Sequence, residues 1–181
     1  MREDTRARIQ EIALRLFTEQ GYEATSLREI AEELGVTKAA LYYHFKTKDD
    51  IVASLVDLRV ADVEELLAWA KGQPKTPEMR RELVQRYADK MRQPRYLEVA
   101  RFLERNQTAL RTHPKLSRMR DTMLALTTEM SAPDATPVEH ISRSLALFAL
   151  HAGKWLPHGD DLTEEEIHKA TMEVAMRLLE P

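Results

Sequence analysis

SLREIAEELGVTKAALYYHFKTK, residues 26–48, contains two short helix signals separated by a turn of three residues. Ser26 with Glu29 three positions later has the pattern of a capping box, which predicts the start of a helix. Gly35 predicts the end of that helix, because glycine readily adopts the left-handed conformation that closes helices. Thr37 predicts the N-terminal cap of a second, shorter helix. The two helices are therefore expected to pack across each other around a tight turn.

The segment before this stretch supplies a third helix. Apolar residues recur at helical spacing from Ile9 to Phe17, and Gly21 predicts the C-terminal cap of a helix over about residues 5–20. Two helices joined by a glycine-containing turn of about three residues are typical of the helix-turn-helix motif, whose second helix enters the major groove of DNA. We therefore predict a helix-turn-helix DNA-binding domain over residues 1–47.

The second helix of this motif carries side chains that suit DNA. Residues 34–48 include three lysines and one histidine but no acidic residue. Leu41 and Phe45 are expected to anchor the helix in the core. Tyr42 and Tyr43 lie about 100° apart on a helix, so at least one ring should be exposed. Lysines suit phosphates, and tyrosines offer hydroxyls and flat faces to bases. An ordinary solvated face is the weaker reading, because acidic residues are absent.

Composition sets the wider limits. The chain has 181 residues, is 43% hydrophobic and 31% charged, and has a net charge of −3, as expected of a globular protein. The net charge alone argues weakly against nucleic acid, so the local acid-free segment matters more. The absence of cysteine excludes disulfides, thiolate zinc sites and thiol nucleophiles. The charged N-terminus without an apolar signal region, and the shortness of the apolar runs, predict a cytoplasmic protein without membrane contact.

Prolines and capping pairs divide the rest of the chain into further helices. No strand-like alternation of any length is present, so we predict an all-α protein of about nine helices. Residues 48–181 are expected to form a helical ligand-sensing and dimerisation domain. The helices predicted after the motif cover residues 48–71, 78–92, 95–112, 115–131, 136–156 and 163–179.

The last two predicted helices have more apolar surface than one core requires. The helix over 136–156 is apolar on nearly all sides, and the final helix has an apolar stripe with a second apolar flank. This pattern predicts a four-helix interface between two copies of the chain, although a thick monomer core is the alternative. The candidate interface residues are Leu145, Phe148, Ala152, Ile167, Thr171, Val174 and Leu178.

The middle helices contain aromatic, methionine and polar residues that suit a pocket for an apolar or mixed ligand. Each of them is also plausible as a core residue. Arg101 would serve an anionic ligand, or else be a surface charge. The candidate ligand-binding residues are Trp69, Tyr87, Met91, Tyr96, Arg101, Phe102, Asn106, Met123, His151 and Trp155.

The pattern FxxxGYxxTSxxxIAxxxGVTxxxLYYHFKxK, residues 17–48, resembles the TetR family of bacterial transcriptional regulators. The resemblance is dense over about the first 55 residues and extends to the rest only as a helical layout. It implies a homodimer that binds a palindromic operator in double-stranded DNA, usually as a repressor released by a small molecule. Ala39 stands where the family often has glycine. The resemblance and the motif together give the candidate DNA-binding residues Ser26, Arg28, Thr37, Lys38, Ala39, Tyr42, Tyr43, His44 and Lys48.

The sequence gives little support for a catalytic, phosphate-binding or metal-binding site. There is no phosphate-binding glycine loop and no HExxH motif, and no histidine pair has metal-ligand spacing. His158, Asp160 and Asp161 share a loop that we interpret as a polar connection. We therefore expect no catalytic, metal or cofactor site. Two alternatives stay open: an all-α enzyme or carrier with a ligand pocket, and a helical protein–protein adaptor, both without operator binding.

Overall fold

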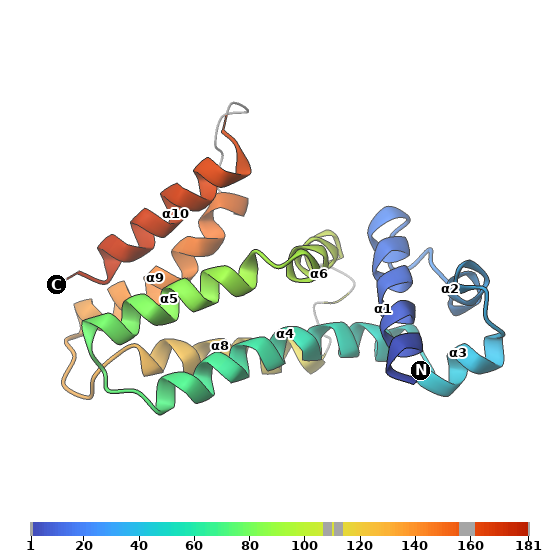
Figure 1. The fold of residues 1–181 in the computed structure, drawn as a ribbon, viewed down its shortest axis with the longest axis horizontal. Coiled ribbons are helices and arrows are strands. Elements are labelled where there is room, and N and C mark those ends of the chain that lie inside the picture. Colours follow the sequence, from blue (N-terminus) through green and yellow to red (C-terminus); the bar gives the residue numbers. More distant parts are fainter. Residues whose placement is uncertain (1, 107–109, 111–113, 156–161, 181) are drawn as a thin grey trace. The chain divides into compact units, whose positions relative to one another are not determined.

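The computed structural model describes residues 2–106, 110, 114–155 and 162–180, without the side chains of residues 2–4, 114, 154 and 155. Within these residues the chain forms nine α-helices and no strand, which confirms the all-α prediction. The helices are α1 (Arg2–Glu19), α2 (Leu27–Leu34), α3 (Lys38–His44), α4 (Lys48–Lys71), α5 (Pro77–Met91), α6 (Pro94–Arg105), α8 (Pro114–Glu129), α9 (Pro137–Trp155) and α10 (Glu164–Leu178) (Figure 1).

The capping signals of the sequence act as predicted around the turn. The Ser26 hydroxyl accepts the backbone N–H of Glu29 at 3.2 Å, and the Glu29 carboxylate accepts the backbone N–H of Ser26 at 2.7 Å. Gly35 has φ of 71°, in the left-handed region that residues with a Cβ rarely adopt. Thr37 accepts the N–H of Ala40 at 3.2 Å and so begins α3. The helix-turn-helix geometry thus follows from local chemistry.

One predicted helix end is wrong. The sequence pattern extends α6 to about residue 112, but the helix ends at Arg105. The next residue, Asn106, has φ of −111° and ψ of 22°, and its side chain accepts the backbone N–H of Tyr22 at 3.1 Å. A contact with a residue 84 positions away therefore accompanies the end of the helix, and no local signal predicts it.

The helices form two compact units. The N-terminal unit comprises residues 1–61 and 93–119, and the C-terminal unit comprises residues 62–92 and 120–181. The boundary falls inside α4 and inside α8, while α6 belongs to the N-terminal unit. Each of these units therefore combines two separate stretches of the chain. The domain boundary at residue 47 stays a prediction.

The core of the N-terminal unit holds the three N-terminal helices and α6 together. α1 packs against α2 and α6, and α2 packs against α3 (Figure 1). Phe17 of α1 stacks on Phe102 of α6 with ring centroids 5.5 Å apart, and its edge meets Tyr22 at 5.3 Å. Both phenylalanines are fully buried. Burial of each such side chain contributes about 1.5–3 kcal/mol to folding, so this aromatic contact fixes α6 against α1.

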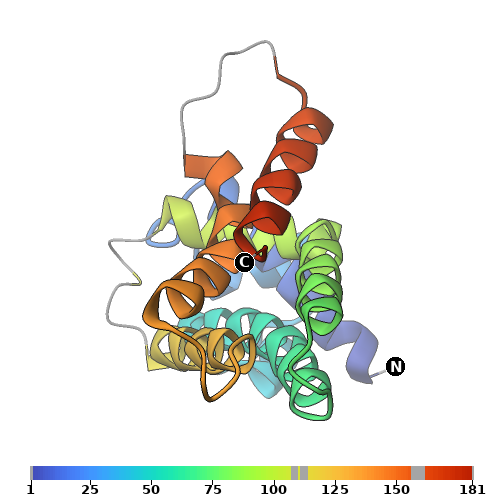
Figure 2. The ribbon, with the colours of Figure 1, turned by 90° about the vertical axis from the view of Figure 1, so that its left-hand side faces the viewer.

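In the C-terminal unit, α5, α9 and α10 pack against one another (Figure 2). Gly153 lies where α9 meets α10: a Cβ at this position would be 2.2 Å from Cγ2 of Ile167. The absence of a side chain therefore permits the close approach of these two helices. Over the described residues, no helix combines the length and the apolar character that crossing a membrane requires.

Candidate nucleic-acid interface

The candidate DNA-binding surface is the outer face of α3, and two buried side chains hold this helix in position. Leu41 is 0% exposed and Phe45 is 1% exposed, as the sequence predicted. Thr37, Lys38 and Ala39, at the N-terminal end of the helix, are exposed to solvent. A helix of seven residues has little stability of its own, so these two anchors and the Thr37 cap set its orientation.

The two tyrosines of α3 have different environments. Tyr43 is 65% exposed, and its ring meets the imidazole of His44 edge-on at 5.3 Å between centroids. Tyr42 is half-buried and packs on the core, with the Lys38 ammonium 5.4 Å from its ring centroid. The expectation that at least one ring is exposed is therefore confirmed, and Tyr43 is that ring. A side chain in this position presents a hydroxyl and an aromatic face outward.

Lys48 occupies a more enclosed position than a phosphate-binding lysine requires. Its ammonium donates to the carbonyl oxygens of Tyr22 at 2.7 Å and Glu23 at 3.2 Å. It also lies 4.6 Å from the centroid of the Tyr22 ring. Burial, and then the hydrogen bond to Asp49, raise the pKa of the Tyr22 hydroxyl, which therefore stays protonated. Lys48 thus joins the start of α4 to the segment that follows α1, and its contact with DNA stays a prediction.

The remaining candidates lie on α2 and at its cap. Ser26 is engaged in the capping box, and Arg28 is exposed and paired with Glu32 at 2.6 Å. Arg6 of α1 lies close to α3, although it is not among the candidates. The structure places its guanidinium 4.3 Å from the Phe45 ring centroid and 3.4 Å from the carbonyl oxygen of His44. Arg6 therefore adjoins the C-terminal end of α3, which no sequence spacing shows.

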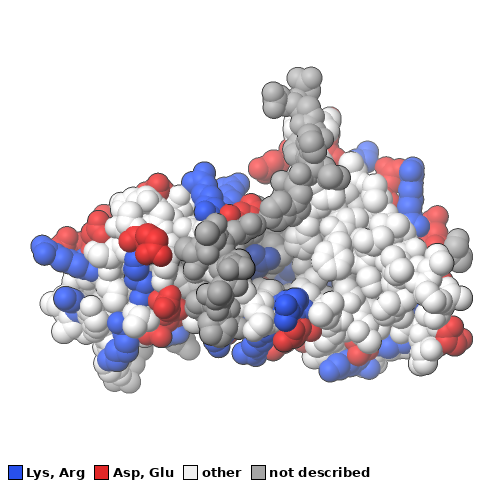
Figure 3. Space-filling view, turned by 180° about the vertical axis from the view of Figure 1, so that it is seen from behind, with Lys and Arg blue, Asp and Glu red and all other residues white. Residues whose placement is uncertain are grey.

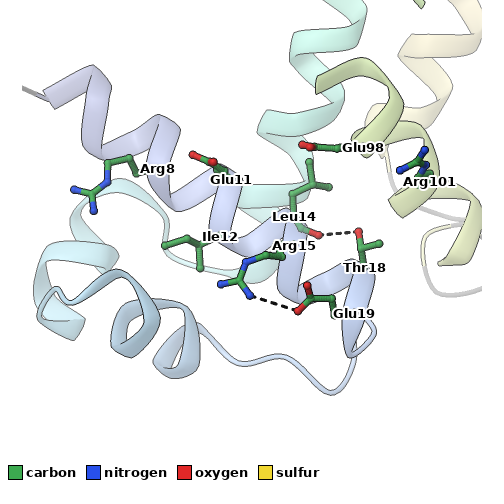
Figure 4. Close-up of a pocket in the computed structure, with 9 residues that line it drawn as sticks. All are labelled: Arg8, Glu11, Ile12, Leu14, Arg15, Thr18, Glu19, Glu98 and Arg101. Atoms are coloured by element: carbon green, nitrogen blue, oxygen red, sulfur yellow. Dashed lines mark hydrogen bonds and ion pairs between the residues drawn. The ribbon is translucent and has the colours of Figure 1, made fainter. Parts of the chain in front are cut away.

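Four candidate ligand-binding residues lie in the N-terminal unit. Phe102 and Tyr96 are buried, and the guanidinium of Arg59 lies 4.0 Å from the Tyr96 ring centroid. Asn106 bonds the backbone of Tyr22. Arg101 lines a surface hollow of about 430 Å³ between α1 and α6 (Figure 4). The hollow mixes the charges and apolar atoms of Arg8, Glu11, Ile12, Leu14, Arg15, Thr18, Glu19, Glu98 and Arg101.

Three candidate ligand residues converge in the C-terminal unit. The Tyr87 hydroxyl lies 2.9 Å from Nε2 of His151 and 3.6 Å from Sδ of Met123. Tyr87 is buried, and its ring centroid is 5.8 Å from that of His151. Trp69 lies under the guanidinium of Arg86 at 4.4 Å, and Met91 is buried, while the side chain of Trp155 is outside the described residues. The structure thus brings together side chains from α5, α8 and α9.

The candidate interface residues on α9 and α10 divide into an outer and an inner group. Leu145, Phe148 and Val174 are exposed, whereas Ala152, Ile167, Thr171 and Leu178 are half-buried. Ile167 and Thr171 face Gly153 across the contact between α9 and α10 within the chain. The exposed stripe of α9 also includes Val138 and Ile141. Seen from behind, the C-terminal unit presents a broad surface with few charged side chains (Figure 3).

No group of three or more histidine, aspartate or glutamate side chains suited to a metal ion exists within the described residues. His158, Asp160 and Asp161, which the sequence predicts to share a loop, lie outside these residues.

A model of a known family matches the region that carries α1 to α3. It is described as bacterial regulatory proteins, tetR family, and it matches residues 9–55. The HTH-type transcriptional regulator AcrR of Shigella flexneri is 45% identical over 64 residues, 35% of this chain and 30% of AcrR. The regulator TtgR of Pseudomonas putida is 46% identical over 55 residues, 30% of this chain and 26% of TtgR. The matched segments thus span less than a third of these relatives.

Solved structures extend the likeness to nearly the whole chain. Mycobacterium smegmatis AmtR is 29% identical, with a TM-score of 0.69 over 94% of this chain and 84% of AmtR. A transcriptional regulator from Aquifex aeolicus VF5 shares the fold at 17% identity, with a TM-score of 0.68 over 93% of this chain and 96% of that one. Fold and recognition surface together define a helix-turn-helix protein. Residues 9–55 thus match the tetR family of bacterial regulatory proteins, and the named relatives that this chain resembles are transcriptional regulators.

Proposed function

We propose that this protein is a cytoplasmic transcriptional regulator that binds a palindromic operator as a homodimer and represses transcription until a small molecule releases it. The observation that carries the proposal is the outer face of α3. Tyr43 is exposed, Lys38 and Ala39 lie on the same helix without an acidic neighbour, and Leu41 and Phe45 hold that helix in place. Such a surface suits direct contact with base edges and phosphates in the major groove.

A palindromic operator requires two copies of α3 related by twofold symmetry. Their recognition helices would enter successive major grooves about 34–36 Å apart. The stripe of Val138, Ile141, Leu145 and Phe148 on α9 supports dimerisation, because these large apolar side chains are 47–74% exposed in the single chain. Val174 on the neighbouring α10 is 48% exposed. A contiguous apolar patch of this kind favours burial against a second copy.

The cluster of Tyr87, His151 and Met123 is the best candidate for the effector site. It combines a hydroxyl, an imidazole and a thioether on three packed helices, which suits an apolar ligand with a hydrogen-bonding group. A ligand regulates only if it prefers one of two conformations of the protein. Helix α4 runs without interruption from the N-terminal unit into the C-terminal unit, so a tilt of α4 would change the position of α3.

The proposal is tested by selecting bound sequences from a random pool of duplex DNA with the full-length chain. A palindromic sequence should be enriched. The logarithm of the binding constant for this sequence should fall linearly with the logarithm of the salt concentration, with a slope near −0.9 for each neutralised phosphate. Lys38→Ala should weaken binding and make that slope less steep by about one unit. The matched control is Lys71→Ala, which removes an exposed lysine at the C-terminal end of α4.

Failure of this experiment would favour one of the alternatives. A carrier or enzyme would bind or convert a small molecule without enriching any DNA sequence. An adaptor would capture a different protein and show no salt-dependent binding to DNA. Binding to DNA that depends neither on the DNA sequence nor on the salt concentration would therefore contradict the proposed function.

A further inference from the structure

We propose that the C-terminal unit contains a buried binding site for a small oxyanion, a carboxylate or a phosphate, between Arg80 of α5 and Arg143 of α9. The helices that carry the two arginines pack against each other. Nothing in the proposed recognition of DNA or of an apolar effector uses either side chain.

Arg80 carries a buried charge, and its guanidinium donates hydrogen bonds to two backbone carbonyl oxygens. It is 5% exposed, and its guanidinium donates from Nε to the carbonyl oxygen of Met130 at 2.7 Å and from Nη2 to that of Lys75 at 3.0 Å. Within the described residues it forms no ion pair with a carboxylate. Burial, and then the charge of Arg143, lower the pKa of Arg80, while the charges of Glu139 and Glu78 offset part of this effect.

Arg143 has a nitrogen available for a ligand. Its side chain is 12% exposed, and Nη2 donates to the carboxylate of Glu139 at 2.5 Å. Nη1 is buried and has no hydrogen-bond partner among the described residues. A guanidinium can present two parallel N–H groups to one oxyanion, so an unpaired buried nitrogen beside a second arginine is suited to anion binding.

The neighbouring acidic groups are already engaged. Glu139 accepts the backbone N–H and the hydroxyl of Thr136, both at 2.8 Å, in addition to Arg143. Glu129 pairs with Lys75. Glu139 therefore serves both arginines, as the hydrogen-bond partner of Arg143 and as a nearby charge for Arg80. Two buried guanidinium groups that share one nearby carboxylate retain positive charge, which a bound anion between the arginines would neutralise.

This site is separate from the apolar stripe proposed as the dimer interface. Residue 143 is two positions from Ile141 and from Leu145, so it lies about 200° around α9 from each of these exposed side chains. Leu147, four positions after Arg143 on the same face, is fully buried. A second copy packed on the stripe would therefore not reach the Arg143 guanidinium, and the anion would have to come from solution.

The test is titration calorimetry of the full-length chain with inorganic phosphate, and separately with acetate, at ionic strength held constant with sodium chloride. Saturable binding of one anion per chain is expected, and the tighter of the two anions identifies the class. Arg143→Met should raise the dissociation constant at least about tenfold, equivalent to one lost charge-assisted hydrogen bond. Arg81→Met, an exposed arginine of α5 that pairs with Glu78, should bind like the wild type.

Two results would overturn the proposal. One is heat from phosphate and acetate equal to that from sodium chloride alone; the other is unchanged affinity in Arg143→Met. Thermal melting by circular dichroism shows whether that variant folds. If it does not, Arg143→Lys keeps the charge but lacks Nη1, and wild-type affinity in that variant would equally contradict the site. None of these measurements involves DNA, so their outcome is independent of the proposed function.

Discussion

Phe148→Ala offers a direct test of the dimer. Phe148 is 50% exposed in the single chain. A phenylalanine side chain exposes about 200 Å² when free, so roughly 100 Å² is available for burial in an interface. At about 25 cal/mol per Å², that area contributes about 2.5 kcal/mol per chain and about 5 kcal/mol per twofold-symmetric dimer. If only half of the area is covered, the dissociation constant of the dimer should still rise about a hundredfold.

Sedimentation over a dilution series measures this constant. The wild type should sediment at twice the mass of the 20.9 kDa chain at micromolar concentration, and Phe148→Ala should shift towards the single chain. Tyr43→Ala is the matched control, because it removes an exposed aromatic ring from α3 instead. It should leave the dimer unchanged and weaken operator binding. A Phe148→Ala protein that dimerises as tightly as the wild type would refute the assignment of α9 to the interface.

Three further substitutions test the N-terminal unit and the packing of the C-terminal unit. Lys48→Met removes two hydrogen bonds to backbone carbonyls and should lower the free energy of unfolding in urea by about 1–2 kcal/mol. Gly153→Ala places a Cβ 2.2 Å from Ile167 and should cost about 1–2 kcal/mol in thermal melts, despite alanine's higher helix propensity; an unchanged melting temperature would contradict the close approach. Hydrogen bonds from the Ser26 side chain and backbone lower the pKa of Glu29, so its contribution is present above the ordinary carboxyl pKa and lost as pH falls through the lowered one. Glu29→Gln should therefore flatten the acid side of the stability profile, and a profile identical to the wild type would contradict this.

The sequence predicts well those features whose causes are local. The capping boxes, the left-handed Gly35 and the burial of Leu41 and Phe45 each depend on residues a few positions apart. The exposure of Tyr43 follows from the same reasoning, because neighbouring side chains on a helix cannot share one direction. These features together specify the helix-turn-helix and the outer face of α3.

Features that depend on contacts between residues far apart in the chain cannot be predicted from local sequence patterns. The end of α6 coincides with a hydrogen bond from Tyr22 to Asn106, and the position of the Lys48 ammonium depends on carbonyls 25 and 26 residues away. Among the candidate ligand residues, Phe102 and Tyr87 are both buried aromatics in amphipathic helices, so periodicity cannot separate them. Only the packing shows that Phe102 stacks on Phe17 while Tyr87 meets His151.

These distant contacts also indicate what determines the position of α3. α3 is too short to be stable alone and takes its orientation from the core that α1 shares with α6. Arg105 of α6 donates to the carbonyl oxygen of Thr18 at 2.8 Å, and Arg95, at the other end of α6, donates to Gln10 at 2.7 Å. α6 is thus held to α1 near both ends, and a single residue, Gln93, separates its first residue from the cap of α5. The chain passes between the two units in α4, between α5 and α6, and in α8, so three segments connect the unit that holds the proposed effector site to the unit that holds the proposed DNA-binding surface.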